Sequence, residues 1–348
     1  MNQPRPPRFR MPAEWEPHAG TWIAWPHQRE DWPGRFEPIP WVYVEIVRHL
    51  HKSERVRLIV GEEEATEARD MLTRACVDLT RVDFLPFLTD RVWLRDSGAI
   101  FVRDGAGRRV ALDWHFNAWA KYDNWHADDR LPEQIADWLD LPREQPTVRG
   151  TRAVLEGGSI EVNGAGLMLT TEECLLSPIQ ARNPALSRAD LEAVFREFLG
   201  VEKVLWLDRG IVGDDTHGHI DDIARFVGPR TVVAAVEDDP GDENRAILAE
   251  NLERLRGMTD LEGRPLEIVT LPMPSPIVFD GQRLPASYAN FYIANGAVLV
   301  PTFNDARDRQ ALGILAGLFP GRDVVGIHAG DLVWGLGTLH CLTQQEPS

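Results

Sequence analysis

A cysteine close to the C-terminal end of the sequence is the first candidate for chemistry. Cys341 follows a turn bracketed by Gly335 and Gly337, and His340 stands beside it. Glycine allows backbone conformations that other residues avoid, so the thiol is predicted to lie on a tight turn. Cysteine is also the most nucleophilic side chain near neutral pH. Because free cysteines are often buried, this stretch alone leaves a purely structural thiol open.

A second candidate is the segment 213–222, which reads Gly-Asp-Asp-Thr-His-Gly-His-Ile-Asp-Asp. If the segment is extended, alternation places His217, His219 and Asp221 on one face. Such a face suits a Mn or Zn site, with Asp215 as a further ligand. It also suits acid–base catalysis by His219 with Asp221 as its charge partner. A solvated loop without chemistry is the weaker interpretation, since ionisable groups rarely cluster so densely without a function.

Two carboxylates stand in front of predicted strands earlier in the chain. Asp96 lies in the run Trp-Leu-Arg-Asp-Ser-Gly that begins at Trp93, and Arg95 is interpreted as half of a local ion pair. Glu156 precedes two glycines that open a strand. Carboxylates are common at the surface-facing ends of strands, so each motif alone is weak evidence of a site.

The elements predicted around these motifs repeat along the chain. Each unit is a hairpin with turn residues between two β-rich runs, followed by a helix and a further strand. The units recur at intervals of roughly 50–70 residues. Because the ionisable motifs stand directly before the hairpins, a ring of such units would bring them to one centre. We expect a single domain over residues 1–348, with residues 1–12 as an extended lead-in. The hairpins are expected at residues 99–114, 159–170, 223–236 and 290–301.

Composition narrows the class of partner. The chain has 348 residues, 43% of them hydrophobic, which is enough to bury a sizeable core. A net charge of −17 disfavours nucleic acid and anionic membrane surfaces and favours a cationic ligand. Three cysteines are too few for a disulfide framework, and the first residues contain no apolar run typical of a secretion signal. We expect a cytoplasmic protein without a membrane span; a homo-oligomer stays open.

Together and in this order, the motifs resemble the agmatine deiminase family, which is related to bacterial peptidylarginine deiminases within the guanidine-modifying (pentein) superfamily. The resemblance runs from Pro12 to the C-terminus. It implies an α/β fold, a five-bladed pseudo-symmetric α/β propeller of ββαβ-type modules. The segments that carry it are Trp-x-Arg-Asp-x-Gly around Asp96, Glu-Gly-Gly-Ser from Glu156, Asn183-Pro184, Gly-His-Ile-Asp ending at Asp221, and His-Cys-x-Thr-Gln-Gln around Cys341.

The resemblance also implies a role for each motif. Cys341 is expected to be the nucleophile and His219 the general acid and base. Glu156 is expected to orient and charge His219, while Asp96 and Asp221 hold a guanidinium group. No metal or other cofactor is expected. Three positions near these motifs depart from residues common in the family, and they are His217, Leu336 and Thr338.

The implied reaction is hydrolytic deimination of agmatine to N-carbamoylputrescine and ammonia through a covalent Cys-thiouronium, a step of putrescine and polyamine biosynthesis. Asp214 and Asp215 are candidates for holding the amine end of this small cation, although Asp also caps turns. Trp93 is a candidate wall for its apolar spacer. The alternatives are a peptidylarginine or other guanidine deiminase, a metal-dependent ureohydrolase that uses the 213–222 cluster as ligands, and an inactive binding protein.

Overall fold

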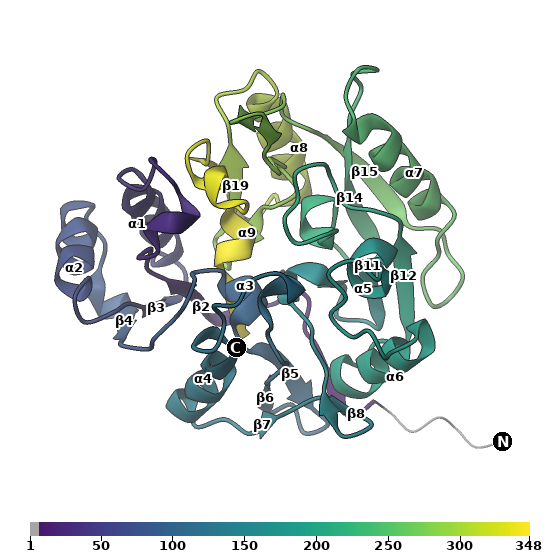
Figure 1. The fold of residues 1–348 in the computed structure, drawn as a ribbon, viewed down its shortest axis with the longest axis horizontal. Coiled ribbons are helices and arrows are strands. Elements are labelled where there is room, and N and C mark those ends of the chain that lie inside the picture. The colour runs from purple at the N-terminus through teal and green to yellow at the C-terminus, as the bar shows by residue number, and fades with distance from the viewer. Residues whose placement is uncertain (1–6) are drawn as a thin grey trace.

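Five sheets of three or four strands form the framework of residues 7–348, the part of the chain that the computed structural model describes. In each sheet an antiparallel strand pair continues through a helix into a parallel neighbour. Figure 1 shows the sheets following one another around the middle of the molecule, where the short helices α3 (Leu94–Ser97) and α9 (Leu339–Leu342) lie.

All five sheets share a core of one antiparallel pair followed by one parallel strand, and two of them have a fourth strand at an edge. The bounds of the strands are as follows. One sheet joins both ends of the chain in the order β21 (Gln344–Pro347), β2 (His18–Ala24), β3 (Arg55–Ile59) and β4 (Val82–Leu85). The next has β1 (Phe9–Arg10), β5 (Ile100–Asp104), β6 (Arg109–Leu112) and β7 (Arg143–Glu144). The other three are β10 (Glu161–Val162), β11 (Leu167–Thr171) and β12 (Lys203–Leu207); β13 (Ala224–Phe226), β14 (Thr231–Val236) and β15 (Glu267–Pro272); and β18 (Tyr292–Ile293), β19 (Ala297–Thr302) and β20 (Asp323–His328).

Helices connect the parallel strands. The long ones are α1 (Ile39–Leu50), α2 (Ala65–Arg74), α4 (Leu131–Leu139), α6 (Arg188–Leu199), α7 (Asn244–Arg256) and α8 (Asp308–Leu318), and α5 (Glu172–Leu176) is shorter. Single 3₁₀ turns are η1 (Arg29–Asp31), η2 (Leu79–Arg81), η3 (Ala118–Ala120), η4 (Asp128–Arg130), η5 (Gly157–Ser159), η6 (Ile220–Asp222) and η7 (Leu332–Gly335). Two small hairpins pair β8 (Thr147–Val148) with β9 (Thr151–Arg152) and β16 (Val278–Phe279) with β17 (Gln282–Arg283).

Helix α6 shows how the local sequence sets an element's bounds. The side chain of Ser187 accepts a hydrogen bond from the backbone N–H of Asp190, and the Asp190 carboxylate accepts one from the backbone N–H of Ser187. This capping box satisfies donors that a helix start would leave unpaired. Gly200 ends the helix in the left-handed region at φ 73°, and the apolar face between the two caps is buried.

The two ends of the chain close into one sheet. Strand β21 pairs antiparallel with β2, which places Trp22 opposite Gln344. The indole of Trp22 also donates to the buried carboxylate of Glu346 at 3.2 Å. The strand that follows Cys341 is therefore fixed to the first sheet, and the turn that carries the thiol is anchored on its C-terminal side.

The four hairpins expected from the sequence are confirmed as β5–β6, β10–β11, β13–β14 and β18–β19, and so is the α/β class. The lead-in expected over residues 1–12 lies partly outside the described residues. From Phe9 onward it differs from the expectation, because Phe9 and Arg10 pair with the edge of β5 as strand β1.

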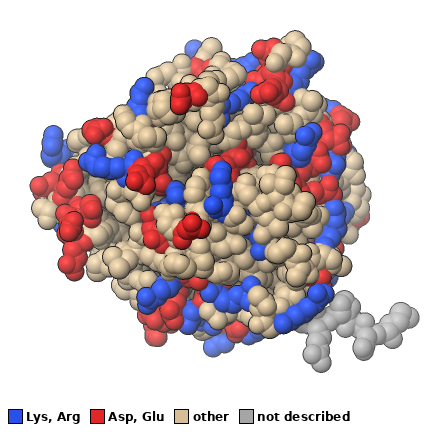
Figure 2. Space-filling view, viewed as in Figure 1, with Lys and Arg blue, Asp and Glu red and all other residues tan. Residues whose placement is uncertain are grey.

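Charge is distributed rather than gathered on the viewed surface. The chain carries a net charge of −17, and Figure 2 shows acidic and basic side chains interspersed over this face. Many of them form ion pairs, such as Arg55 with Asp83 at 2.6 Å. Among the described residues, none of the helices is both long enough and apolar enough to cross a membrane.

Candidate active site

In the described chain, four short helical turns lead directly into the first strands of sheets and meet at the centre. Asp96 lies in α3, Glu156 immediately precedes η5, His219 immediately precedes η6, which contains Asp221, and Cys341 lies in α9. Turn α3 contacts both α9 and η5, and η5 contacts η6. Residues far apart in sequence are therefore brought together, as the repeat pattern predicts.

The thiol of Cys341 lies at the floor of a cavity of about 480 Å³ that Asp96 also lines. Cys341 is only 7% exposed, because the tight turn predicted from the glycines leads into a one-turn helix packed into the centre. The sulfur lies 3.8 Å from Asp221 Oδ2. Burial raises the pKa of the thiol well above its ordinary value, and the negative charges of Asp221, Asp222 and Asp96 raise it further.

His219 stands between two carboxylates. Its Nδ1 lies 3.8 Å from Asp96 Oδ1, and its Nε2 lies 3.9 Å from Glu156 Oε2. Neither ring nitrogen has a hydrogen-bond partner within residues 7–348. Burial opposes protonation, but the charge of Asp96, the neighbouring Cys174 thiol and the charge of Asp221 outweigh it, so the pKa of His219 lies well above its usual value. A protonated imidazole can therefore act as an acid here.

Asp96 is held by two donors. Its Oδ1 accepts from the backbone N–H of Gly158 at 2.9 Å, and its Oδ2 accepts from Trp119 Nε1 at 2.9 Å. Burial, followed by the nearby acidic groups, raises the pKa of Asp96 to about 6 despite the opposing effect of His219. A Cβ at position 158 would lie 2.5 Å from His219 Nδ1 and 2.8 Å from Asp96 Oδ1. Glycine is thus required where this backbone approaches the site.

Asp221 differs from Asp96 in its charge state. Burial favours its neutral form, but a hydrogen bond to His340 and the charges of His340 and His219 prevail, so its pKa lies below the ordinary value. One oxygen, Oδ2, is engaged by His340 at 2.7 Å. The other, Oδ1, has no hydrogen-bond partner among the described residues. This oxygen is therefore free to accept a hydrogen bond from a bound group.

These groups form a thiol, an imidazole and two carboxylates around one point, an arrangement that suits a planar cation with several N–H donors. The sequence profile of the Porphyromonas-type peptidyl-arginine deiminases matches residues 10–347. The chain belongs to this deiminase family.

Relatives cover the whole chain. The agmatine deiminase of Ectopseudomonas mendocina is 36% identical over an alignment of 368 positions that covers 99% of this chain and 97% of the relative. The solved agmatine deiminase of Enterococcus faecalis superposes with a TM-score of 0.90 at 32% identity, covering 98% of this chain and 96% of that one. The solved C. jejuni agmatine deiminase with substrate bound superposes with a TM-score of 0.86 at 30% identity, covering 98% of this chain and 96% of that one.

In this deiminase the segment 213–222 is not extended, so the expected common face of its histidines is wrong. His217 has φ 62° and Gly218 has φ 100°, which turn the chain before η6. His217 therefore points its Nε2 toward Ser177 Oγ at 3.2 Å, while Asp215 pairs with Lys121. The ligand set considered for a ureohydrolase is not brought together.

A different trio of potential ligands is close in space. Single atoms of Glu156, Cys174 and His219 lie within 4.8 Å of one another, and all three residues are buried. Among residues 7–348, this is the only group of three potential metal ligands so close together. Glu156 is already engaged on its other oxygen, where Arg182 Nε donates at 3.0 Å. Two of the three, Glu156 and His219, belong to the cluster around Cys341 described above.

The residues expected at the amine end have different environments. Asp214 accepts hydrogen bonds from the backbone N–H groups of Thr216, Gly218 and His219 at 2.7–3.0 Å, contacts that brace the loop carrying His219. Asp215 instead lines the cavity, where Tyr122 donates to it at 2.6 Å and Lys121 pairs with it.

Tryptophans line the same cavity. Trp93 is a lining residue, as expected, and a Cβ at position 337 would lie 2.7 Å from its ring. Gly337 thus lets the loop before the thiol pack against the indole. Trp119 lines the cavity as well and was not singled out from the sequence. It lies in η3 at φ 59°, a left-handed turn that no local motif indicates.

Asn290 is a further residue that the sequence reasoning missed. Its Nδ2 lies 3.1 Å from Cys341 Sγ, and its Oδ1 accepts from the backbone N–H of His340 and the hydroxyl of Thr338. Asn290 stands before β18 as the other site residues stand before their strands. The repeat pattern therefore contained the signal that could have identified it.

The ion pair expected for Arg95 exists but is not local. Arg95 is buried and donates to Glu14 Oε2 at 3.2 Å, across 81 positions of sequence, and to Gln345 Oε1 at 2.7 Å. The turn geometry of α3 directs its side chain away from Asp96, which is occupied by other donors. Arg95 thus links the N-terminal segment to the strand after the nucleophile.

Proposed function

We propose that this chain hydrolyses agmatine to N-carbamoylputrescine and ammonia through a covalent thiouronium on Cys341. The observation that carries the proposal is the convergence of Cys341 with His219, Asp96 and Asp221, a cluster of which Cys341 and Asp96 line one cavity. Full-length similarity to agmatine deiminases supports the substrate. In this proposal Glu156 orients and charges His219 from 3.9 Å.

The empty site holds a protonated thiol and a protonated imidazole, because the pKa values of both are raised. A guanidinium bound between Asp96 and Asp221 brings a positive charge beside the sulfur. That charge stabilises the thiolate, and the thiol proton leaves to solvent. Binding thus activates the nucleophile in place of a separate base.

In the first half-reaction the Cys341 thiolate attacks the central carbon and gives a neutral tetrahedral species. His219 then protonates one amino group, the C–N bond breaks, and ammonia departs. The product of this step is a cationic thiouronium on the sulfur, with His219 left neutral. The two carboxylates hold the planar cation in both states, so the reacting carbon keeps its position.

In the second half-reaction the neutral His219 removes a proton from water, and the oxygen bonds to the same carbon. The C–S bond breaks, and the thiolate leaves. The hydroxyl group on the product carbon gives its proton to the sulfur, which restores the thiol and leaves the neutral urea. The proton that the thiol released on substrate binding is taken up by ammonia, which becomes ammonium. One acid–base residue therefore serves both halves.

Selection of agmatine would arise farther from the sulfur. Trp93 and Trp119 offer apolar walls for a four-carbon spacer, and Asp215 offers a carboxylate toward the amine. Because Asp215 already pairs with Lys121, we assign it a modest contribution. Asp214 is assigned mainly to bracing the His219 loop.

The proposal extends to architecture and setting. The five sheets of like strand order fit a single five-bladed α/β propeller domain, with the site on its axis. Similarity to agmatine deiminases favours a place in putrescine and polyamine biosynthesis. The acidic composition supports a cytoplasmic enzyme that needs no nucleic-acid partner, and a homo-oligomer stays open.

Product analysis tests the reaction. The purified protein is incubated with agmatine and no added metal, and products are identified by mass. N-carbamoylputrescine with ammonia supports the proposal, whereas urea with putrescine would contradict it. Parallel assays with arginine and a blocked arginine peptide compare kcat/KM, and a peptide processed better than agmatine would assign the site to peptidylarginine instead.

A further inference from the structure

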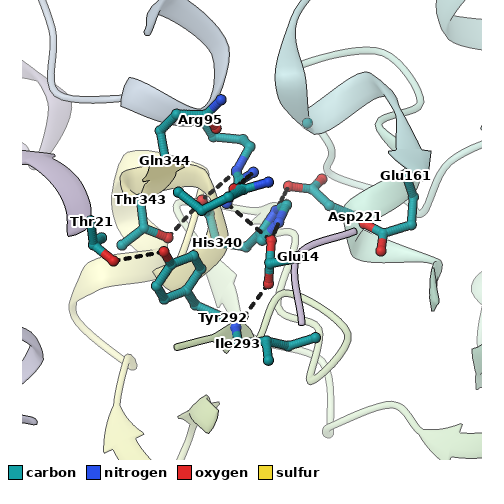
Figure 3. Close-up of polar contacts among 12 residues, drawn as sticks. Glu14, Thr21, Arg95, Glu161, Asp221, Tyr292, Ile293, His340, Thr343 and Gln344 are labelled. Carbon is teal, nitrogen blue, oxygen red and sulfur yellow. Dashed lines mark hydrogen bonds and ion pairs between the residues drawn. The ribbon is translucent and has the colours of Figure 1, made fainter. Parts of the chain in front are cut away.

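The ring of His340 lies between two carboxylates from distant parts of the chain. Its Nδ1 is 2.7 Å from Asp221 Oδ2, and its Nε2 is 2.8 Å from Glu14 Oε2. Figure 3 shows the imidazole placed between these side chains. All three residues are almost completely buried, with at most 5% exposure. In such surroundings each charge needs a partner.

Glu14 is fixed as an anion by its surroundings. Arg95 donates to its Oε2 at 3.2 Å, and Arg225 donates to its Oε1 at 2.9 Å. The backbone N–H of Ile293 donates to Oε1 at 2.8 Å. Burial favours the neutral acid, but Arg225, His340 and Arg95 together hold the pKa of Glu14 well below its ordinary value.

The two contacts determine the state of the ring. Carboxylates accept hydrogen bonds, and a neutral imidazole carries a single N–H donor. With Glu14 and Asp221 both ionised, a neutral ring would direct a lone pair at one buried anion. Only the imidazolium donates to both. His340 therefore supplies Asp221 with a positive neighbour at Oδ2.

The same short helix carries this ring and the nucleophile. His340 and Cys341 are consecutive in α9, and Asn290 Oδ1 accepts from the backbone N–H of His340 at 3.0 Å. The other end of that amide lies 3.1 Å from the sulfur. Fixing His340 against Asp221 thus also fixes the spacing between the carboxylate and the thiol, which is 3.8 Å.

We propose that His340 is a positioning residue of the deiminase reaction: Glu14 holds its ring as an imidazolium, and the ring holds Asp221 as an oriented carboxylate for the substrate guanidinium. This role rests on the proposed function of the site. The ring engages Oδ2 of Asp221 and leaves Oδ1 toward the substrate. The N-terminal segment, far from the catalytic motifs in sequence, thereby completes the active site through Glu14.

Removing the ring should change how Asp221 titrates. Without its cation, Asp221 would face buried acids and tend to hold a proton that must leave before a guanidinium binds. In the parent enzyme Asp96 governs the acid limb of kcat/KM. In His340→Gln the carboxyl of Asp221 should also have to lose a proton. The acid limb of kcat/KM should therefore shift to higher pH by about 1–3 units and become steeper. Besides Arg95 and Glu14, the titratable groups around this pair are Asp96, Glu161, His219, Asp222, Arg225 and Cys341.

A neutron structure of the unmodified enzyme at pH 8 tests the protonation without any variant. We expect deuterium on both ring nitrogens of His340. Deuterium on one nitrogen alone would overturn the imidazolium assignment, whatever substrate the enzyme uses.

Kinetics then test the positioning role. We expect His340→Gln to lower kcat/KM for agmatine about 100-fold at pH 7 and to recover partly at higher pH, and Glu14→Gln to shift the limb in the same direction. The control is His115→Gln, which removes a His–Asp pair of 2.9 Å outside this network and should leave the limb unchanged. A folded His340→Gln enzyme with the parent pH profile would overturn the proposal. Failure of the parent enzyme to deiminate agmatine would instead overturn the proposed function.

Discussion

The floor and the mouth of the cavity are built differently. At the floor, Asp96 and Cys341 lie on short buried turns and are at most 7% exposed. At the mouth, Phe279 belongs to the small β16–β17 hairpin and is 36% exposed. The centroid of its ring lies 3.5 Å from that of the Trp334 ring. Asp31 also lines the cavity, and burial raises its pKa to about 6 despite the neighbouring Arg91.

This difference separates two functions. In the proposed function, the buried groups at the floor determine which bond is broken. The more exposed side chains at the mouth determine which guanidine reaches the floor. Changes at the floor should therefore lower kcat for every substrate, whereas changes at the mouth should alter the ratio between substrates.

The largest effect is expected for the nucleophile. Cys341→Ser should lower kcat for all guanidines by about 10⁴-fold or more, because the poorer nucleophile cannot form the covalent species. Cys76→Ser, at an exposed cysteine, is the matched control and should retain activity. Initial rates of ammonia release measure both. Near-normal turnover by Cys341→Ser would mean that the floor does not work as described.

The next effect concerns Asp96, which must lose its proton to hold a guanidinium. Its pKa of about 6 predicts that kcat/KM falls as the pH drops below about 6. Asp96→Asn should lower kcat/KM by about 10²–10³-fold for agmatine and arginine alike. If Asp96→Asn lowered kcat/KM for only one of the two substrates, Asp96 would act in substrate selection, as the residues at the mouth are expected to do.

Stability provides a second readout for Asp96. Because its folded pKa is raised, the folded state binds the proton more tightly than the unfolded state, so stability falls as the pH rises from about 4 to about 6. Relative to Asp96→Asn, the parent enzyme should lose about 2–3 kcal/mol of unfolding free energy over that range. Denaturant unfolding at several pH values measures the difference, and a difference independent of pH would contradict the assignment.

Much of the floor was predictable from sequence, because its residues occupy equivalent places before the strands of a repeat. Asn290 follows the same rule and could have been found. Trp119 could not, since its left-handed turn lies in a connection that does not repeat. The contact of His340 with Glu14 spans 326 positions and depends on closure of β21 onto β2. The mouth has no repeated signal, so the sequence indicated it least.

A smaller effect is expected from reagents that differ in charge. The raised pKa of the Cys341 thiol predicts slow alkylation by a neutral haloacetamide at pH 7, with the rate rising toward high pH. A haloacetamidine of matched intrinsic reactivity should react about 10–100-fold faster, because its cation binds the floor carboxylates. Second-order inactivation rates give the ratio. Equal rates would remove the argument that the substrate activates the thiol.

The smallest effect is expected at Asp215. Since Lys121 already pairs with it, Asp215→Asn should raise KM for agmatine by only about 3–10-fold and leave kcat unchanged. Asp214→Asn is the comparison and should lower thermal stability and kcat instead, because Asp214 braces the His219 loop. If KM for agmatine is unchanged in Asp215→Asn, the amine end is bound elsewhere at the mouth.

The most direct test of the account is a rapid-quench experiment on the covalent step. The enzyme is mixed with agmatine and acid-quenched within the first turnover. It is then digested, and the masses of its peptides are measured by mass spectrometry. We predict that the peptide containing Cys341 gains the mass of agmatine less ammonia, transiently and only in the enzyme with an intact thiol. Product formation without any adduct, or an adduct on Cys174 that turns over at the same rate, would contradict the central claim.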